Sequence, residues 1–298
     1  MGEISIDPKF NIHETYKKVR ILNPYRNGAA PSSVVLEPET TAYMNALGIP
    51  DDSSTSIYGI NNSALWSLIN NFISTLKANS LYSLMYKIYP KIGSTEAQQA
   101  VDIITLSSGT FVGNWGFNAS GAIADGYSYF NSNVFPSTLS PTSNDFGFTG
   151  VANQNVLSNK SAYGTLIGIY TPYRRSQLYI NWNITADRVG IYFNESLSPG
   201  VITASNIGVF TVTKNNDLAV GYRNGNQLTS ASASTRTFPS GSYYEAASNW
   251  VDNGYASNFI EGLIGTTAYH KHLDSANVNI LFNAIDALEI GLGRKQYV

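Results

Sequence analysis

The spacing of apolar residues changes twice along this chain, and the order of the changes limits the folds that it can adopt. Between residues 39 and 92 apolar residues recur at helical spacing, from about 110 to 260 they favour alternate positions, and one amphipathic segment closes the chain. This segregation excludes a parallel α/β sheet, in which helices and strands alternate. The sequence therefore predicts a mainly β protein with a helical segment before the strands and a helix after them.

The strand region predicts antiparallel sheets. Its clearest strand has apolar residues at every second position, namely Leu178, Ile180, Trp182 and Ile184. Because side chains alternate between the faces of a strand, we expect these four to face a core between two sheets and their odd-numbered neighbours to face outward. Asn224-Gly225 is typical of a tight hairpin turn. Turn signals about every ten residues favour a two-sheet sandwich or jelly roll.

Three helices are expected before the strands. Pro38-Glu39 places a proline and an acid in the first turn of one helix, and Gly48 suits its C-cap. Asn61-Asn62 begins a second helix with a wide apolar stripe. A third helix is expected over residues 81–88, ended by Pro90. Its apolar positions are Leu81, Leu84, Met85 and Ile88.

A closing helix is expected over about residues 274–292. Asp274 is a favourable N-cap residue. One face of the helix is apolar and carries Val278, Leu281, Phe282, Ile285, Leu288 and Leu292. Because this face has to lie against other apolar residues, we expect the helix to pack on the sandwich edge or beside the early helices.

The first 38 residues differ from the rest, since charged residues concentrate there and Pro24 and Pro31 interrupt the segment. We predict that residues 1–38 form an attachment arm or linker and that residues 39–298 form one domain. Its parts are helices at about 39–92, the sandwich at about 93–272 and the closing helix. The apolar residues expected to make the attachment are Ile4, Ile6, Phe10, Ile12, Tyr16, Val19, Ile21 and Leu22. The alternative is a terminus that packs on its own domain.

Charge and cysteine content exclude several functions. Only 13% of the residues are charged and the net charge is −2, so no basic surface is available to attract nucleic acid. The chain has no cysteine, which excludes disulfides and thiolate metal sites. No segment reaches the roughly 18 apolar residues that span a bilayer, and no secretory signal pattern is present. We therefore expect no nucleic-acid or membrane partner, and assembly in a cytoplasm.

Residues with catalytic or metal-binding chemistry are scattered. Glycosidases need two carboxylates flanking the sugar bond. Glu195, Glu245 and Glu261 are isolated in the sequence, and we expect them at solvated edges or as hydrogen-bonding residues at a rim. His270-Lys271-His272 offers two imidazoles without a third ligand, so we expect a surface or subunit-contact role. The prediction is no catalytic residue, no cofactor and no metal.

Three segments resemble bacteriophage and prophage virion proteins. The first, INNFI at 69–73 continuing to MYKIYPKIGS at 85–94, is similar to the family pattern INxLVxxLKxxxIWxKMKAIYPFVGGTA. The second, FVGNWGFN at 111–118 with GAIADGYSYFN at 121–131, is similar to FNGGWTHSxxGAxPNGTNGYAxTFxNP. The third comprises FIEGLIG at 259–265 and GLGR at 291–294. A strand that reads FIGAxN in the family reads YEAASN at 244–249.

The resemblance implies a concanavalin A-like (laminin-G-like) sandwich of the kind found on phage fibres, tail components and head decorations, often in phages of Bacteroidetes. We therefore expect a non-enzymatic virion structural protein whose partners are other virion proteins and copies of itself, as a trimer or a ring. Twenty tyrosines and abundant asparagine support an alternative, an adhesin that binds host-surface carbohydrate. A glycan-degrading enzyme is the third alternative.

Overall fold

The computed structural model describes residues 35–57, 59–118, 121–140, 145–153, 164–171, 174–180, 188–193, 196–202, 207–216, 218–232 and 237–295. Leu36–Val298 form one compact unit. The eight predicted attachment residues lie outside the described residues, as do Trp182, Ile184 and the side chain of Ile180. The predictions made for them are therefore open.

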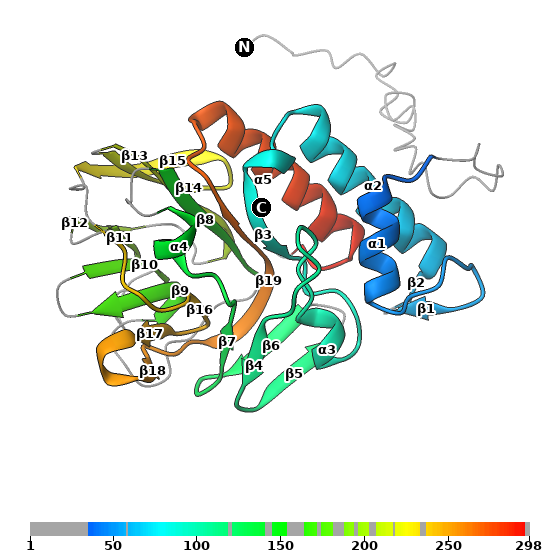
Figure 1. The fold of residues 1–298 in the computed structure, drawn as a ribbon, viewed down its shortest axis with the longest axis horizontal. Coiled ribbons are helices and arrows are strands. Elements are labelled where there is room, and N and C mark those ends of the chain that lie inside the picture. The colour runs from blue at the N-terminus through cyan, green and yellow to red at the C-terminus, as the bar shows by residue number, and fades with distance from the viewer. Residues whose placement is uncertain are drawn as a thin grey trace, which may run out of the picture. The chain divides into compact units, whose positions relative to one another are not determined.

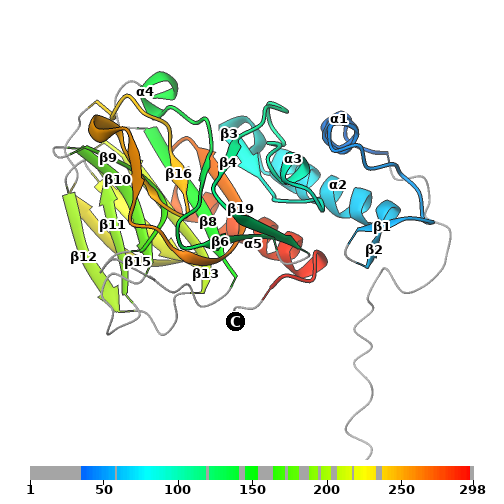
Figure 2. The ribbon, with the colours of Figure 1, turned by 90° about the horizontal axis from the view of Figure 1, so that it is seen from below.

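The compact unit has three layers, which are two β-sheets and a layer of helices (Figures 1 and 2). The central sheet has the strand order β15-β14-β13-β8-β19-β6-β5, with β3 paired to β19. Its strands are β3 (Met85–Tyr89), β5 (Trp115–Asn118), β6 (Gly121–Asp125), β8 (Asp145–Ala152), β13 (Gly208–Asn215), β14 (Leu218–Arg223), β15 (Asn226–Ser232) and β19 (Glu261–His270).

The outer sheet has the strand order β12-β11-β10-β9-β16-β7-β4, and β17 pairs with both β9 and β18. Its strands are β4 (Thr110–Val112), β7 (Tyr129–Asn131), β9 (Gly164–Thr171), β10 (Arg174–Ile180), β11 (Arg188–Phe193), β12 (Ser196–Ile202), β16 (Tyr244–Glu245), β17 (Ser248–Trp250) and β18 (Tyr255–Ser257). Among the described strands the pairings are antiparallel, apart from β17 with β9. The predicted antiparallel β-sandwich is confirmed.

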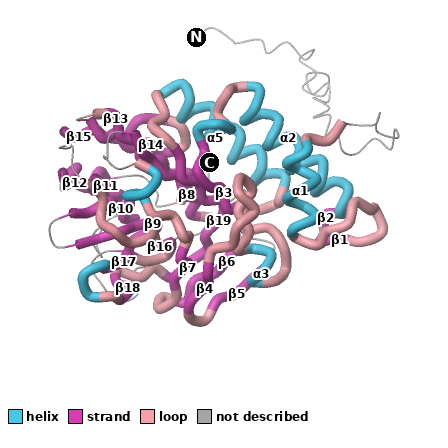
Figure 3. The backbone as a smooth tube through the Cα atoms, viewed as in Figure 1, coloured by secondary structure: helices cyan, strands magenta, loops and turns pink. Residues whose placement is uncertain are grey.

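Helices α2 (Asn62–Ala78) and α5 (Ser275–Gly291) pack against each other and form the third layer, beside the central sheet (Figure 3). The expectation that the closing helix lies beside the early helices is therefore confirmed. The remaining short elements are α1 (Pro38–Ala46), β1 (Ser56–Ile57), β2 (Ile60–Asn61), η1 (Tyr82–Leu84), α3 (Glu96–Gln99), α4 (Pro136–Leu139) and η2 (Val251–Asn253).

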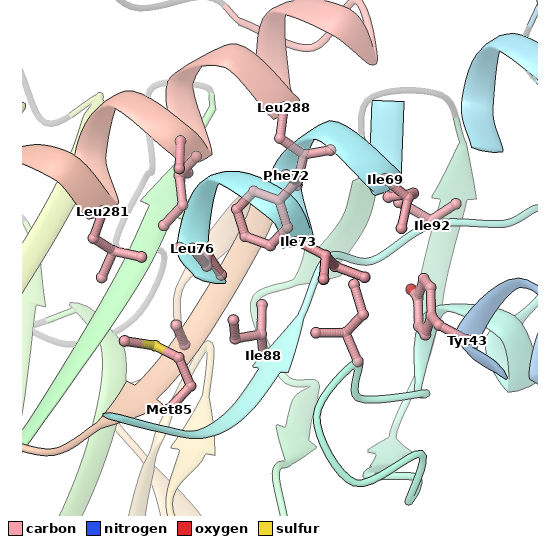
Figure 4. Close-up of a cluster of buried hydrophobic side chains, with 14 of the residues drawn as sticks. Tyr43, Ile69, Phe72, Ile73, Leu76, Met85, Ile88, Ile92, Leu281 and Leu288 are labelled. Carbon is pink, nitrogen blue, oxygen red and sulfur yellow. The ribbon is translucent and has the colours of Figure 1, made fainter. Parts of the chain in front are cut away.

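Two apolar cores lie on the two faces of the central sheet. The core between the sheets is largely aromatic and includes Phe130, Phe146, Phe148, Phe210, Tyr243 and Tyr269. The core between the sheet and the helices joins α2 and α5 to β3, as Figure 4 shows for Phe72, Leu281 and Ile88. Because both faces are covered, the central strands show no alternation in burial, and in β19 every residue after Glu261 is buried.

The third predicted helix is wrong. Residues 82–84 form only the short helix η1, and Met85–Tyr89 continue as strand β3. Helix α2 ends where Ser80 adopts a left-handed φ of 59°, and β3 then pairs with β19, Ile88 opposite Ala268. A short apolar run fits helical and strand spacing equally, and here the pairing with a distant strand decides between them.

The predicted ends and turns that depend on local sequence are confirmed. Proline lies in the first turn of α1, and Gly48 after it has a φ of +65°. The side chains of Asn61 and Asp274 cap α2 and α5 by accepting hydrogen bonds from the backbone. Asn224-Gly225 joins β14 to β15 with positive φ at both residues. Leu178 is buried in the core between the sheets, as predicted.

Candidate functional site

Five aromatic side chains lie on the side of the outer sheet that faces away from the central sheet. We call this set the aromatic face, and its members are Tyr129, Tyr170, Tyr244, Trp250 and Tyr255. They come from β7, β9, β16, β17 and β18. Their neighbours along the strands, Phe130, Ile169 and Glu245, are buried on the opposite side. Side chains alternate between the two faces of a strand, so the aromatic face is turned outward.

Strand register gathers these rings into two groups. Trp250 is directly opposite Tyr170 on one side and Tyr255 on the other. Directly opposed residues share a face of the sheet, and the ring centroids of Trp250 lie 5.0 Å from Tyr170 and 5.2 Å from Tyr255. The second group is Tyr129 and Tyr244, whose rings stack at 4.2 Å.

A reversal of the chain at Ala246 brings both groups to the same strand. Residues before it pair antiparallel with β9 and residues after it pair parallel with β9, so that Tyr244 and Ser248 both pair with Gly168. Ala246 has a φ of +64°, a conformation that non-glycine residues rarely adopt. Gly168 is itself buried, so the two groups of rings lie on either side of a covered position.

Polar groups accompany the rings. Ser248 accepts a hydrogen bond of 2.6 Å from the Gln177 amide beside Gly168. Asp252 is exposed in the turn that precedes Tyr255. Trp250 Nε1 and Ser257 Oγ are buried and have no hydrogen-bond partner among the described residues. Buried polar atoms of native proteins nearly always have a hydrogen-bond partner, so these two atoms are exceptions to that rule.

The phenol of Tyr244 stays protonated over the physiological range. Burial, and next the neighbouring phenol of Tyr129, raise the pKa of Tyr244 to about 12. Tyr255 is the most accessible ring, with 48% of its surface exposed. The aromatic face therefore combines the neutral hydroxyl group of Tyr244 with apolar ring surfaces.

The most unusual buried charges lie on the other side of the outer sheet. Lys91 and Glu245 are 1% and 0% exposed, and Lys91 Nζ lies 3.0 Å from Glu245 Oε2. Nζ lies 3.2 Å from the ring centroid of Phe130, and the rings of Tyr89 and Phe111 are next to it at 4.8 and 5.1 Å. Burial lowers the pKa of Lys91 to about 8, although Glu245 opposes this shift.

Glu245 is not the solvated or rim residue that was predicted. Its Oε1 accepts hydrogen bonds from Thr267 Oγ1 at 2.7 Å and from Tyr269 Oη at 3.2 Å. The sequence contained one signal for this pair. In the phage patterns that the chain resembles, phenylalanine stands at the position of Lys91 and isoleucine at that of Glu245, so a charged residue at each position is unexpected.

A second buried ion pair explains the GLGR ending. Arg294 donates to the carbonyl oxygens of Pro90 and Lys91 at 2.8 and 3.1 Å, and its Nε lies 3.2 Å from Glu289 Oε2. Glu289 Oε1 also accepts from the backbone N of Thr266 at 3.0 Å, where β19 has an irregular register. The arginine therefore ties the end of α5 to the residues after β3.

The predicted surface role of the histidines is wrong for His270. This side chain is fully buried, and its ring nitrogens contact Thr149 Oγ1 at 3.1 Å and the Lys271 carbonyl oxygen at 2.7 Å. Burial lowers the pKa of His270 to about 4. His272 is partly buried and contacts Thr213 at 2.9 Å. Within the described residues no group of three or more acidic or histidine side chains is arranged to hold a metal ion.

Glu261 is not isolated either, because strand pairing places it directly opposite Asp125. Opposed residues of antiparallel strands have Cβ atoms about 5 Å apart. Asp125 Oδ1 is already an acceptor for Tyr127 N at 2.9 Å and Ser128 Oγ at 2.7 Å, which form the turn between β6 and β7. Glu195 lies outside the described residues. In the part of the chain that the structure describes, no helix has the length and hydropathy of a membrane span.

No known protein family and no curated protein matches the sequence. Among solved structures, a sialidase of Trypanosoma rangeli in complex with 2,3-difluoro-KDN matches 76% of this chain, with a TM-score of 0.50 and 11% identity. The match covers 41% of the sialidase chain, so this chain corresponds to less than half of that enzyme. A mutant of the same sialidase that displays trans-sialidase activity matches with a TM-score of 0.50 and 10% identity.

Two further structures have lower TM-scores. Domain 4 of an extracellular arabinanase from Geobacillus stearothermophilus, in complex with arabinotriose, matches 66% of this chain and 98% of its own, with a TM-score of 0.45 and 14% identity. The binding domain of botulinum neurotoxin serotype D matches 69% of this chain and 53% of its own, with a TM-score of 0.46 and 13% identity. At such identities a similarity concerns the fold alone.

Proposed function

We propose that this protein is a non-enzymatic, carbohydrate-binding sandwich module of a bacteriophage or prophage particle, with the aromatic face as its ligand surface. One observation carries the proposal: register and the reversal at Ala246 place five rings from five strands on one outward face. The ring surface that stays accessible, most of all on Tyr255, is the part that a ligand would cover.

Carbohydrate suits this surface chemically. Sugars present apolar C–H faces that pack on aromatic rings, and hydroxyl groups that need hydrogen-bond partners. The phenols of Tyr244 and Tyr255 and the carboxylate of Asp252 supply both donors and an acceptor beside the rings.

The placement on a virion is supported by the resemblance of residues 40–294 to phage structural proteins. On this proposal residues 1–38 attach the domain to the particle and the outer sheet is presented to the host. Two carboxylates support the proposal that the protein is non-enzymatic. Asp125 accepts a hydrogen bond from Ser128 in a turn, and Glu245 is enclosed in the core, where a polysaccharide does not reach it. Trimeric or ring assembly remains part of the proposal.

Glycan-array binding by the purified protein tests the ligand. The variant Tyr255→Ala removes the most exposed ring, and we expect it to weaken binding to any array hit by about 1 kcal/mol, or about fivefold in Kd. Leu218→Ala is the matched control, because Leu218 is also 48% exposed but lies on β14 of the central sheet. No glycan binding by the wild type, or equal losses in both variants, would contradict the proposal.

Incubation with the bound polysaccharide tests the absence of catalysis. We expect no release of reducing sugar by the wild type. Release that is abolished by both Asp125→Asn and Glu261→Gln would instead assign hydrolysis to the carboxylates that face each other across β6 and β19.

A further inference from the structure

We propose that the side chains of Lys91 and Glu245 condense into an amide, an intramolecular isopeptide bond that joins the two sheets covalently. The two groups sit on different sheets, since Lys91 follows β3 of the central sheet and Glu245 lies on β16 of the outer sheet. Nζ and Oε2 lie 3.0 Å apart, with side-chain exposures of 1% and 0%. Folding has already paid much of the translational and rotational entropy that two groups would lose on meeting in solution, so the barrier to their reaction is lower.

The surroundings lower the cost of forming the uncharged partners that the reaction needs, because both groups are removed from water, although the ring faces attract the ammonium form. Three aromatic rings enclose Nζ, and among the described residues it has no hydrogen-bond acceptor to hold the ammonium form other than the carboxylate with which it is ion-paired. In an apolar site an ion pair loses hydration, so that transfer of a proton from the ammonium to the carboxylate becomes accessible. A neutral amine then faces a carboxylic acid, which are the two forms that condense.

The bond changes balance without a further reactant. The Nζ lone pair attacks Cδ of Glu245 and forms the C–N bond, while the charge that develops on Oε1 is stabilised by the donors Thr267 Oγ1 and Tyr269 Oη. The C–Oε2 bond then breaks, and Oε2 leaves as water with the acid proton and one proton from Nζ. One amide and one water replace one amine and one carboxylic acid.

A nearby ion pair shows why proximity is not sufficient. Lys77 Nζ lies 2.7 Å from both Glu37 Oε2 and Glu39 Oε2, closer than Lys91 is to Glu245, but these side chains are about one third exposed. The two carboxylates raise the pKa of Lys77, so that its amine stays protonated and unreactive. Lys77 is therefore an internal control within the same molecule.

Mass spectrometry of the full-length wild-type protein tests the proposal. We expect the denatured chain to be lighter than its sequence by the mass of one water, and a digest to yield one branched peptide that contains Lys91 and Glu245. An unmodified mass, or loss of water at any other position, would overturn the proposal. This measurement needs no variant, so it does not depend on how a substitution affects folding.

Two variants sharpen the assignment. Glu245→Gln presents an amide in place of the acid, so it should lose ammonia instead of water and give the same branched peptide. Lys91→Met should keep its full sequence mass and, when denatured, migrate more slowly on a gel than the cross-linked wild type. A branched peptide that persists in Lys91→Met, or that involves Lys77, would overturn the assignment to the enclosed pair.

Discussion

Protonation of His270 should destabilise the fold in mild acid. The folded state holds its pKa at about 4, against an ordinary value of 6.5, because the ring is fully buried between Thr149 and the Lys271 carbonyl. The unfolded chain therefore binds more protons than the folded chain as the pH falls below 6.5, and stability is lost in that direction. The folding free energy that depends on a neutral His270 is present in full above pH 6.5 and is lost progressively as the pH falls toward 4.

The size of the effect follows from the two pKa values. Between pH 7.5 and pH 5 the unfolded histidine gains most of a proton while the folded one gains about a tenth, which costs about 2 kcal/mol of folding free energy. This window lies above the ordinary pKa of aspartate and glutamate, so those groups contribute less to the difference. The pKa of His272 is also lowered by burial, and this residue adds to the loss with the same sign.

Urea unfolding at pH 7.5, 6 and 5 measures this loss. His270→Gln retains a hydrogen-bonding side chain that does not titrate, and we expect its stability to fall by about 2 kcal/mol less than that of the wild type over this range. His272→Gln is the control, because this partly buried side chain should produce a smaller difference. Parallel pH profiles for the wild type and His270→Gln would refute the argument that burial sets this pKa.

Three further predictions concern stability and attachment. Phe72→Ala should cost about 3 to 5 kcal/mol in urea unfolding, because its ring is buried between the helices and β3, whereas the exposed Leu106→Ala should change little. Ala246→Gly should change the melting temperature little, because relief of about 1 kcal/mol of left-handed strain offsets the loss of a buried methyl group, whereas Ala247→Gly, which has no positive φ, loses a buried methyl group without that relief and should lower it. Deleting residues 1–22 should leave the melting transition unchanged but abolish incorporation into particles, and normal incorporation would contradict the arm.

The features that the sequence predicts correctly depend on local information. The caps of α1, α2 and α5 and the turn at Asn224-Gly225 depend on a few adjacent residues, and each was predictable. The prediction of a helix over residues 85–88 is wrong because the strand that pairs with them begins at Glu261. The spacing of apolar residues in a short segment does not reveal a pairing with a strand so distant in the sequence.

The buried charges were missed for a related reason. Glu245 lies between Tyr244 and Ala246 in the sequence and His270 between Tyr269 and Lys271, and only tertiary packing removes the two side chains from water. The position of the aromatic face could not be predicted either, because it depends on the chain reversal at Ala246. There alanine adopts a positive φ that is common only for glycine. Abundant tyrosine indicated the type of surface but not its position.

The pairing of β3 with β19 has a consequence for the kinetics of folding. Residues from the first third of the chain complete a sheet whose other strands come from the remainder, and Ile88 must find Ala268 across the whole intervening sandwich. Contacts so distant in sequence close large loops and slow the search for the native state. We expect refolding to be much slower than for a helical protein of this length, and a fragment that ends before Glu261 to leave α2 and β3 without a surface on which to fold.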